Sequence, residues 1–138
     1  MRDKRVFVDT NILVYAHDKD AGAKRHAASR CVADLWNRSA PPSVSIQVLQ
    51  ELYVNLIRKK VAPATAREVV CDYLQWNVVP NDSPLLLEAI QLSQRWGVSF
   101  WDAAIIAAAR RAGADVLWSE DLNEGQDYDG VKVVNPLK

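Results

Sequence analysis

Cysteine and histidine are scarce in this chain of 138 residues, which contains only two of each. Cys31 and Cys71 lie inside predicted helices without CxxC or Cys/His ligand spacing, so we expect buried free thiols in a reducing compartment. His17 and His26 pair neither with each other nor with a cysteine at the spacing of metal ligands. The sequence therefore gives no support for a zinc site.

Long apolar runs and an excess of charge of either sign are also missing. No stretch approaches the roughly 20 apolar residues that a membrane span needs, and the run Val6 to Val8 is too short for a secretion signal. We therefore expect a soluble cytoplasmic protein with no membrane partner. Lysine plus arginine and aspartate plus glutamate number 17 each, so RNA binding would depend on a local patch and not on a global basic field.

The length and composition are those of an ordinary globular domain. Hydrophobic residues make up 49% of the chain and charged residues 25%, which is far from a disordered composition. A chain of this length buries a proper core without disulfide bonds or a structural metal. We expect residues 1–138 to form a single domain.

Short β-branched segments alternate with segments that have helical apolar spacing. The expected strands are 5–8, 43–45, 78–79, 115–119 and 131–134, and the segment 120–130 is expected to be a polar loop. The expected helices are 12–16, 21–38, 46–60, 63–74, 83–96 and 100–112. This alternation predicts an α/β fold in which a mainly parallel sheet is covered on both faces by helices.

Four acidic residues far apart in the sequence fall at positions where a binding site is expected. Asp9 directly follows the first strand, and Asp121 lies two residues beyond Ser119 at the end of the fourth. Ligands of open α/β sheets bind outside the carboxyl ends of the strands. Asp102 falls in the first turn of its helix, and Glu51 lies off the apolar stripe of its own helix. The four carboxylates can therefore face one cleft.

Carboxylates that meet in such a cleft form a cation site. Like charges held close together raise one another's pKa, and burying an ionised carboxylate without a partner costs several kcal/mol. Mg²⁺ prefers oxygen ligands and often leaves positions for water and phosphate. The pattern indicates metal-dependent phosphate chemistry, provided that the fold brings the acids together.

Several short strings, in this order and spacing, resemble the PIN-domain ribonucleases, and among them the VapC-type toxins of bacterial toxin–antitoxin pairs. The resemblance covers essentially the whole chain. It rests on Val6-Phe7-Val8-Asp9-Thr10-Asn11, Gln50-Glu51-Leu52, Phe100-Trp101-Asp102-Ala103, Leu117-Trp118-Ser119-Glu120-Asp121 and the tail from Gly130 to Pro136.

This resemblance implies a PIN-like three-layer fold with a mainly parallel sheet of about five strands flanked by helices. It assigns Asp9, Glu51, Asp102 and Asp121 to the catalytic metal site, with Glu120 as the alternative to Asp121 for the fourth acid. Thr10, Asn11 and Ser119 would be supporting polar groups.

The resemblance also implies a cofactor and partners. The cofactor would be Mg²⁺, with Mn²⁺ as a substitute, and the substrate would be RNA. The partners would be a cognate antitoxin and a second copy of the chain, bound through the helix that carries Trp36 or the helix that carries Tyr53.

Two other functions remain open from the residues alone. A phosphatase that resembles the haloacid dehalogenases would use Asp9 as its nucleophile, but such enzymes have an Asp-x-Asp pattern and this chain has Asn11 at the second position. A non-catalytic cation-binding or phosphoacceptor module would hold a cation for structure. Such a structural cation would bind tightly and raise the melting temperature of the protein.

Overall fold

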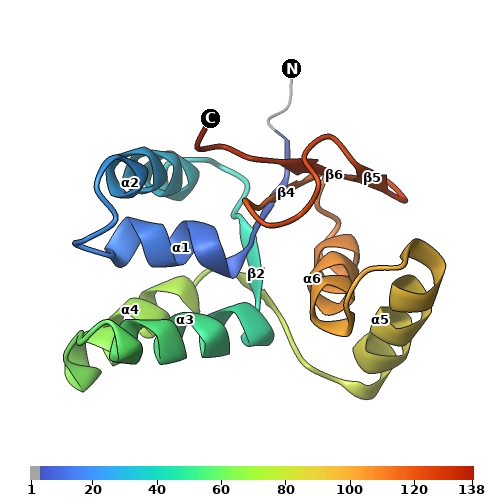
Figure 1. Cartoon of the computed structure of the whole chain (residues 1–138), viewed down its shortest axis with the longest axis horizontal. Coiled ribbons are helices and arrows are strands. Elements are labelled where there is room, and N and C mark those ends of the chain that lie inside the picture. The colour runs from blue at the N-terminus through green and yellow to red at the C-terminus, as the bar shows by residue number, and fades with distance from the viewer. Residues whose placement is uncertain (1–3) are drawn as a thin grey trace.

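The structure, a computed structural model, describes residues 4–138 (Figure 1). The strands in this part of the chain are β1 (Val6–Val8), β2 (Ser43–Ser45), β3 (Asn77–Val79), β4 (Val116–Trp118), β5 (Asp127–Tyr128) and β6 (Val131–Val134). The helices are α1 (Thr10–His17), α2 (Ala23–Trp36), α3 (Ile46–Arg58), α4 (Pro63–Tyr73), α5 (Ser83–Trp96) and α6 (Phe100–Arg111).

The strands form one sheet in the order β3-β2-β1-β4-β6-β5. All neighbouring strands are parallel except β5 and β6. The chain builds outward from β1 to β3 with α1 to α4 on one side of the sheet, and it then returns through α5 and α6 on the other side to place β4 beside β1 (Figure 1). The direction of strand order therefore reverses between β1 and β4. The predicted α/β class, with helices on both faces of a mainly parallel sheet, is confirmed.

The strand β5 corrects the prediction that 120–130 is a loop. Tyr128 pairs with Val131 across a two-residue turn in which Asp129 and Gly130 both have positive φ, at 54° and 104°. Tight hairpins require this backbone conformation at both turn residues, and the Asp-Gly pair is among the strongest sequence signals for it. The sheet consequently has six strands, with a short antiparallel hairpin at one edge.

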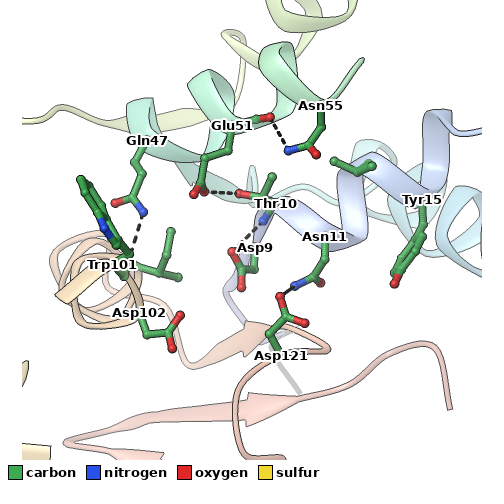
Figure 2. A pocket seen from close by; sticks show the side chains of 12 residues that line it. Asp9, Thr10, Asn11, Tyr15, Gln47, Glu51, Asn55, Trp101, Asp102 and Asp121 are labelled. Carbon is green, nitrogen blue, oxygen red and sulfur yellow. Dashed lines mark hydrogen bonds between the residues drawn. The ribbon is translucent and has the colours of Figure 1, made fainter. Parts of the chain in front are cut away.

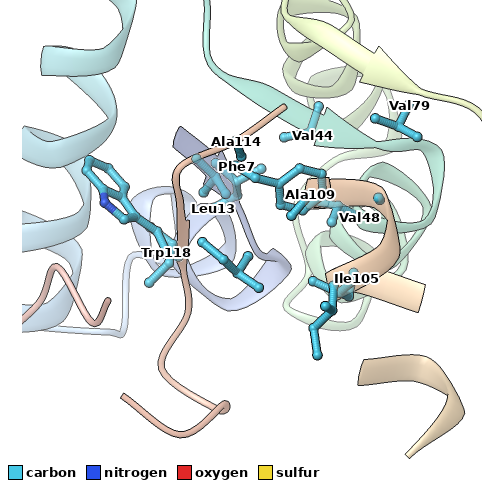
Figure 3. Close-up of a cluster of buried hydrophobic side chains, with 14 of the residues drawn as sticks. Phe7, Leu13, Val44, Val48, Val79, Ile105, Ala109, Ala114 and Trp118 are labelled. Atoms are coloured by element: carbon cyan, nitrogen blue, oxygen red, sulfur yellow. The ribbon is translucent and has the colours of Figure 1, made fainter. Parts of the chain in front are cut away.

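Helix α6 lies at the centre of the core. Its residues Ala103 to Ala109 are all buried, and alanines allow the helix backbone to approach the sheet closely. Ile105 and Ala109 lie in the same buried cluster as Phe7 of β1 and Val44 of β2 (Figure 3). This packing fixes the start of α6, where Asp102 lies, relative to the carboxyl ends of β1 and β4.

The prediction of buried thiols is wrong for Cys71, which is exposed, whereas Cys31 is partly buried and both cysteines are free. The buried positions of α4 are Ala66 and Tyr73, so the helical period turns Cys71 toward solvent. Among residues 4–138, no helix is both long enough and apolar enough to cross a membrane.

Truncating a core leucine should show how much the central strands contribute to stability. Leu117 of β4 is fully buried, so we expect Leu117→Ala to lower the free energy of unfolding by about 2–5 kcal/mol. The same substitution at Leu74, which is 49% exposed, should cost less than about 1 kcal/mol. Urea unfolding of both variants measures the difference. Equal effects would contradict the assignment of β4 to the core.

Candidate active site

The candidate site lies at the point where strand order reverses. Asp9 follows β1 and Ser119 follows β4, and Val8 and Trp118 are directly paired in the two strands. The backbone N–H of Asp9 donates to the carbonyl of Trp118 at 2.9 Å. In doubly wound sheets the crevice at this reversal is where ligands bind. Residues 110 positions apart in sequence therefore meet at the expected place.

All four predicted acids line one pocket of about 320 Å³ (Figure 2). Asp9 precedes α1, Glu51 comes from α3, Asp102 from α6 and Asp121 from the loop after β4. Within the described residues, no lysine, arginine or histidine is among those that line this pocket. The pocket therefore gathers negative charge from four elements without a neutralising side chain in its lining.

Asp9 is the most buried of these acids, with 8% of its surface exposed. Its Oδ1 accepts from the backbone N–H of Thr10 at 2.7 Å, and its Oδ2 accepts from the Ser119 hydroxyl at 2.9 Å. Burial is the largest cause that raises the pKa of Asp9 to about 6. The hydrogen bonds from Thr10 and Ser119 lower the pKa, and the nearby charges of Glu51 and Asp121 raise it. A bound cation would relieve this electrostatic cost.

Glu51 lies on a polar ridge of α3 that faces α1. The Thr10 hydroxyl donates to Glu51 Oε1 at 2.7 Å, which orients the carboxylate at the pocket wall. Gln47 and Asn55 line the same pocket one helical turn before and after Glu51. We did not predict these two residues from the sequence, although the spacing of four places them on the same face of a helix as Glu51.

The neighbours Glu120 and Asp121 have different surroundings. Asp121 lines the pocket, and its Oδ2 accepts from the Asn11 side-chain amide at 2.9 Å. Glu120 is not among the lining residues, and its carboxylate accepts from the Tyr15 hydroxyl at 2.6 Å and pairs with Lys24 at 2.9 Å. These contacts favour Asp121 over Glu120 as the fourth acid of the pocket.

Asp102 lies in the first turn of α6. The hydroxyl of Ser99 accepts from the Asp102 backbone N–H at 3.1 Å and caps the helix. The adjacent Trp101 is 65% exposed and lines the pocket. The exposed indole forms part of the pocket wall beside the Asp102 carboxylate.

The donors in the pocket fit a hard divalent cation. Carboxylate, hydroxyl and amide oxygens surround the pocket, and such ligands suit Mg²⁺ or Mn²⁺. Across residues 4–138, no group of three histidine, cysteine or acidic side chains is gathered closely enough to bind a metal with all three directly. Mg²⁺ usually takes one or two carboxylates and keeps several waters, so the arrangement suits an ion bound partly through water.

The sheet is doubly wound, and its acidic pocket lies where the strand order reverses. This is the position at which α/β proteins of this class bind ligands. The chain belongs to the PIN-domain family, whose family model matches residues 6–124. The family expected from the sequence is thereby confirmed. No curated protein sequence matches the chain significantly.

Solved structures share this fold at low sequence identity. VapC20 of Mycobacterium tuberculosis, a toxin that cleaves the sarcin-ricin loop, has a TM-score of 0.68 and 22% identity, over 84% of this chain and 89% of VapC20. A toxin–antitoxin complex from Klebsiella pneumoniae has a TM-score of 0.72 and 18% identity, over 95% and 97%. DNA-bound VapBC from Salmonella typhimurium has a TM-score of 0.63 and 20% identity, over 95% and 97%.

Proposed function

We propose that this PIN-domain protein is a metal-dependent ribonuclease that hydrolyses phosphodiester bonds of RNA. The observation that carries the proposal is the pocket in which Asp9, Glu51, Asp102 and Asp121 gather with no cationic side chain among its described lining residues. Family membership and the likeness to a toxin that cleaves the sarcin-ricin loop support RNA as the substrate class.

Asp9 and Asp102 would hold Mg²⁺ or Mn²⁺, with Glu51 and Asp121 binding directly or through water. When bound, the ion lowers the pKa of a coordinated water and neutralises charge that builds on the phosphate. Thr10 and Ser119 fix the two oxygens of Asp9, Thr10 also orients Glu51, and Asn11 orients Asp121. We expect products with a 5′-phosphate and a 3′-hydroxyl.

Asp9 is poorly placed for the phosphatase alternative. Both of its carboxylate oxygens already accept hydrogen bonds, from the Thr10 backbone and from Ser119. Asn11, at the position of the second acid in that pattern, is engaged with the backbone of Glu120 and the carboxylate of Asp121. These contacts favour a role for Asp9 as a positioned metal ligand and not as a nucleophile.

Incubation of the purified protein with single-stranded RNA tests the proposal. Cleavage should require added Mg²⁺ or Mn²⁺, stop with EDTA and resume when the metal is restored in excess. Ligation-based sequencing of the fragments should detect 5′-phosphate ends. Cleavage that persists unchanged in EDTA would contradict the proposal, and so would an acyl-phosphate trapped on Asp9.

We further propose that the ribonuclease is the toxin of a toxin–antitoxin pair. Two of the structural neighbours are toxin–antitoxin assemblies, one from Klebsiella pneumoniae and one from Salmonella typhimurium. The acidic pocket would suit an antitoxin segment that inserts a basic side chain. Expression of the protein alone should arrest growth, and coexpression of the gene encoded beside it should restore growth.

A second copy of the chain is proposed to bind the face formed by α3 and α5. These two helices carry six large exposed apolar side chains, Tyr53, Val54, Ile57, Leu86, Leu87 and Ile90. Gln50 of α3 and Leu86 of α5 line a common groove between the two helices. Trp36, on the other helix considered for this role, packs against Tyr73 and Trp76, which favours the helix that carries Tyr53.

A charge on this face should separate the two copies. We expect Leu87→Glu to convert a dimer into a monomer, because Leu87 is 61% exposed and a glutamate there would have to be buried without a partner. Leu74→Glu, at the exposed residue that follows α4, serves as the matched control and should remain dimeric. Light scattering coupled to size-exclusion chromatography measures both. A monomeric parent protein would contradict the proposal.

A further inference from the structure

The loop that follows β4 is held by contacts to helices α1 and α2. We infer that Glu120 is a positioning residue whose carboxylate, bound by Tyr15 and Lys24, keeps Asp121 turned into the acidic pocket. The inference rests on the proposed function, because it concerns how the proposed metal site is held.

Both carboxylate oxygens of Glu120 are engaged by side chains of two helices. The Tyr15 hydroxyl of α1 donates to Oε1 at 2.6 Å, and Lys24 Nζ of α2 lies 2.9 Å from Oε2. Lys24 also lies 4.9 Å from the centre of the Tyr15 ring, so the three side chains contact one another. Glu120 therefore ties the loop to two helices at once.

Helix α1 carries a second contact to the same loop. Asn11 Oδ1 accepts from the Glu120 backbone N–H at 3.2 Å, and Asn11 Nδ2 donates to Asp121 Oδ2 at 2.9 Å. Asn11 and Tyr15 are four residues apart and project from the same side of α1 (Figure 2). One face of α1 thus holds Glu120 through Tyr15 and Asp121 through Asn11.

The hydrogen bond from Tyr15 should matter more than the ion pair with Lys24. Lys24 is 51% exposed, and ion pairs in solvent contribute little. The Glu120 side chain is 23% exposed, and a hydroxyl that donates to a carboxylate at 2.6 Å makes a strong, charge-assisted bond. Loss of the Tyr15 hydroxyl should therefore loosen the loop, whereas loss of the lysine should have a smaller effect.

Direct measurement of Mn²⁺ binding by electron paramagnetic resonance tests this inference without depending on catalysis. We expect Glu120→Ala and Tyr15→Phe each to weaken Mn²⁺ binding about 10-fold, as for other partners that orient metal ligands. The double variant should bind no more weakly than Glu120→Ala, because both changes remove the same contact. Glu120→Gln, which keeps an oxygen for Tyr15, should recover most of the affinity.

Matched measurements separate positioning from simple loss of structure. Tyr73→Phe removes a hydroxyl that is hydrogen-bonded to His17, and because neither residue lines the pocket, it should leave Mn²⁺ binding unchanged. Amide hydrogen exchange at Asp121 and Leu122 should speed up in Tyr15→Phe while the global melting temperature stays near that of the parent.

Two results would overturn the inference. Unchanged Mn²⁺ binding in both Glu120→Ala and Tyr15→Phe would show that the contact positions nothing. Loss of binding in Glu120→Ala together with normal or tighter binding in Tyr15→Phe would make Glu120 itself a ligand. In either case the parent still binds Mn²⁺ and the proposed function stands, whereas a parent that binds no Mn²⁺ defeats both proposals.

Discussion

Asp9→Asn is expected to lower the rate of RNA cleavage at saturating Mg²⁺ by at least about 100-fold, in the range found when a preorganised electrostatic group is removed. Asparagine keeps the shape of the side chain and an oxygen for the Thr10 backbone N–H, so the fold should persist. It removes the charge that would hold the ion at the strand end. Asp102→Asn should cause a loss of the same order.

The comparison requires a matched control and a test of folding. Asp72→Asn, on the exposed surface of α4, makes the same chemical change away from the pocket and should leave cleavage unchanged. Circular dichroism and thermal melting establish that each variant is folded. Folded Asp9→Asn and Asp102→Asn proteins that cleave RNA at the parental rate would end the ribonuclease proposal.

Without metal, the parent protein should lose stability relative to Asp9→Asn as the pH rises from 4 to 7. The pKa of Asp9 is raised from 3.8 to about 6 in the folded state, so folding favours its protonated form. The contribution of this group is therefore fully present below about pH 4, is lost as the pH approaches 6 and is absent above it. A rise of this size corresponds to about 3 kcal/mol, since each pKa unit is worth about 1.4 kcal/mol.

Urea unfolding in EDTA at several pH values measures this effect. Asp9→Asn should remove the contribution of this group to the pH dependence and should be more stable than the parent at pH 7, although we expect it to be inactive. Added Mg²⁺ or Mn²⁺ should restore stability to the parent at pH 7 and have little effect on the variant. Metal-free stability that changes between pH 4 and pH 7 in the same way in the parent and in Asp9→Asn would contradict the prediction.

The parallel part of the fold and the placement of the four acids could be predicted from the sequence. The strands β1 and β4 are short apolar segments followed at once by polar residues, and the rule that ligands bind beyond strand ends then located Asp9 and Asp121. Asp102 was recognisable because it falls in the first turn of a helix that Ser99 caps. These signals are local, so they can be recognised in the sequence without knowledge of the tertiary structure.

Other features of the site depend on contacts between distant segments. The separation of Glu120 from Asp121 is produced by Tyr15 and Lys24, which come from helices about 100 residues away in the sequence. The exposure of Trp101 likewise depends on which face of α6 meets the sheet. The hairpin at Asp129 and Gly130 is different, because the Asp-Gly pair is a local turn signal that is present in the sequence itself.

The central claim is that the four carboxylates share a divalent cation, and anomalous diffraction from crystals soaked in Mn²⁺ tests it most directly. The account predicts an anomalous peak in the pocket, within about 2–2.5 Å of carboxylate oxygens that include one from Asp9 or Asp102. The peak should vanish in Asp9→Asn crystals grown and soaked in the same way. Strong Mn²⁺ peaks elsewhere on the protein, with none between these acids, would contradict the account.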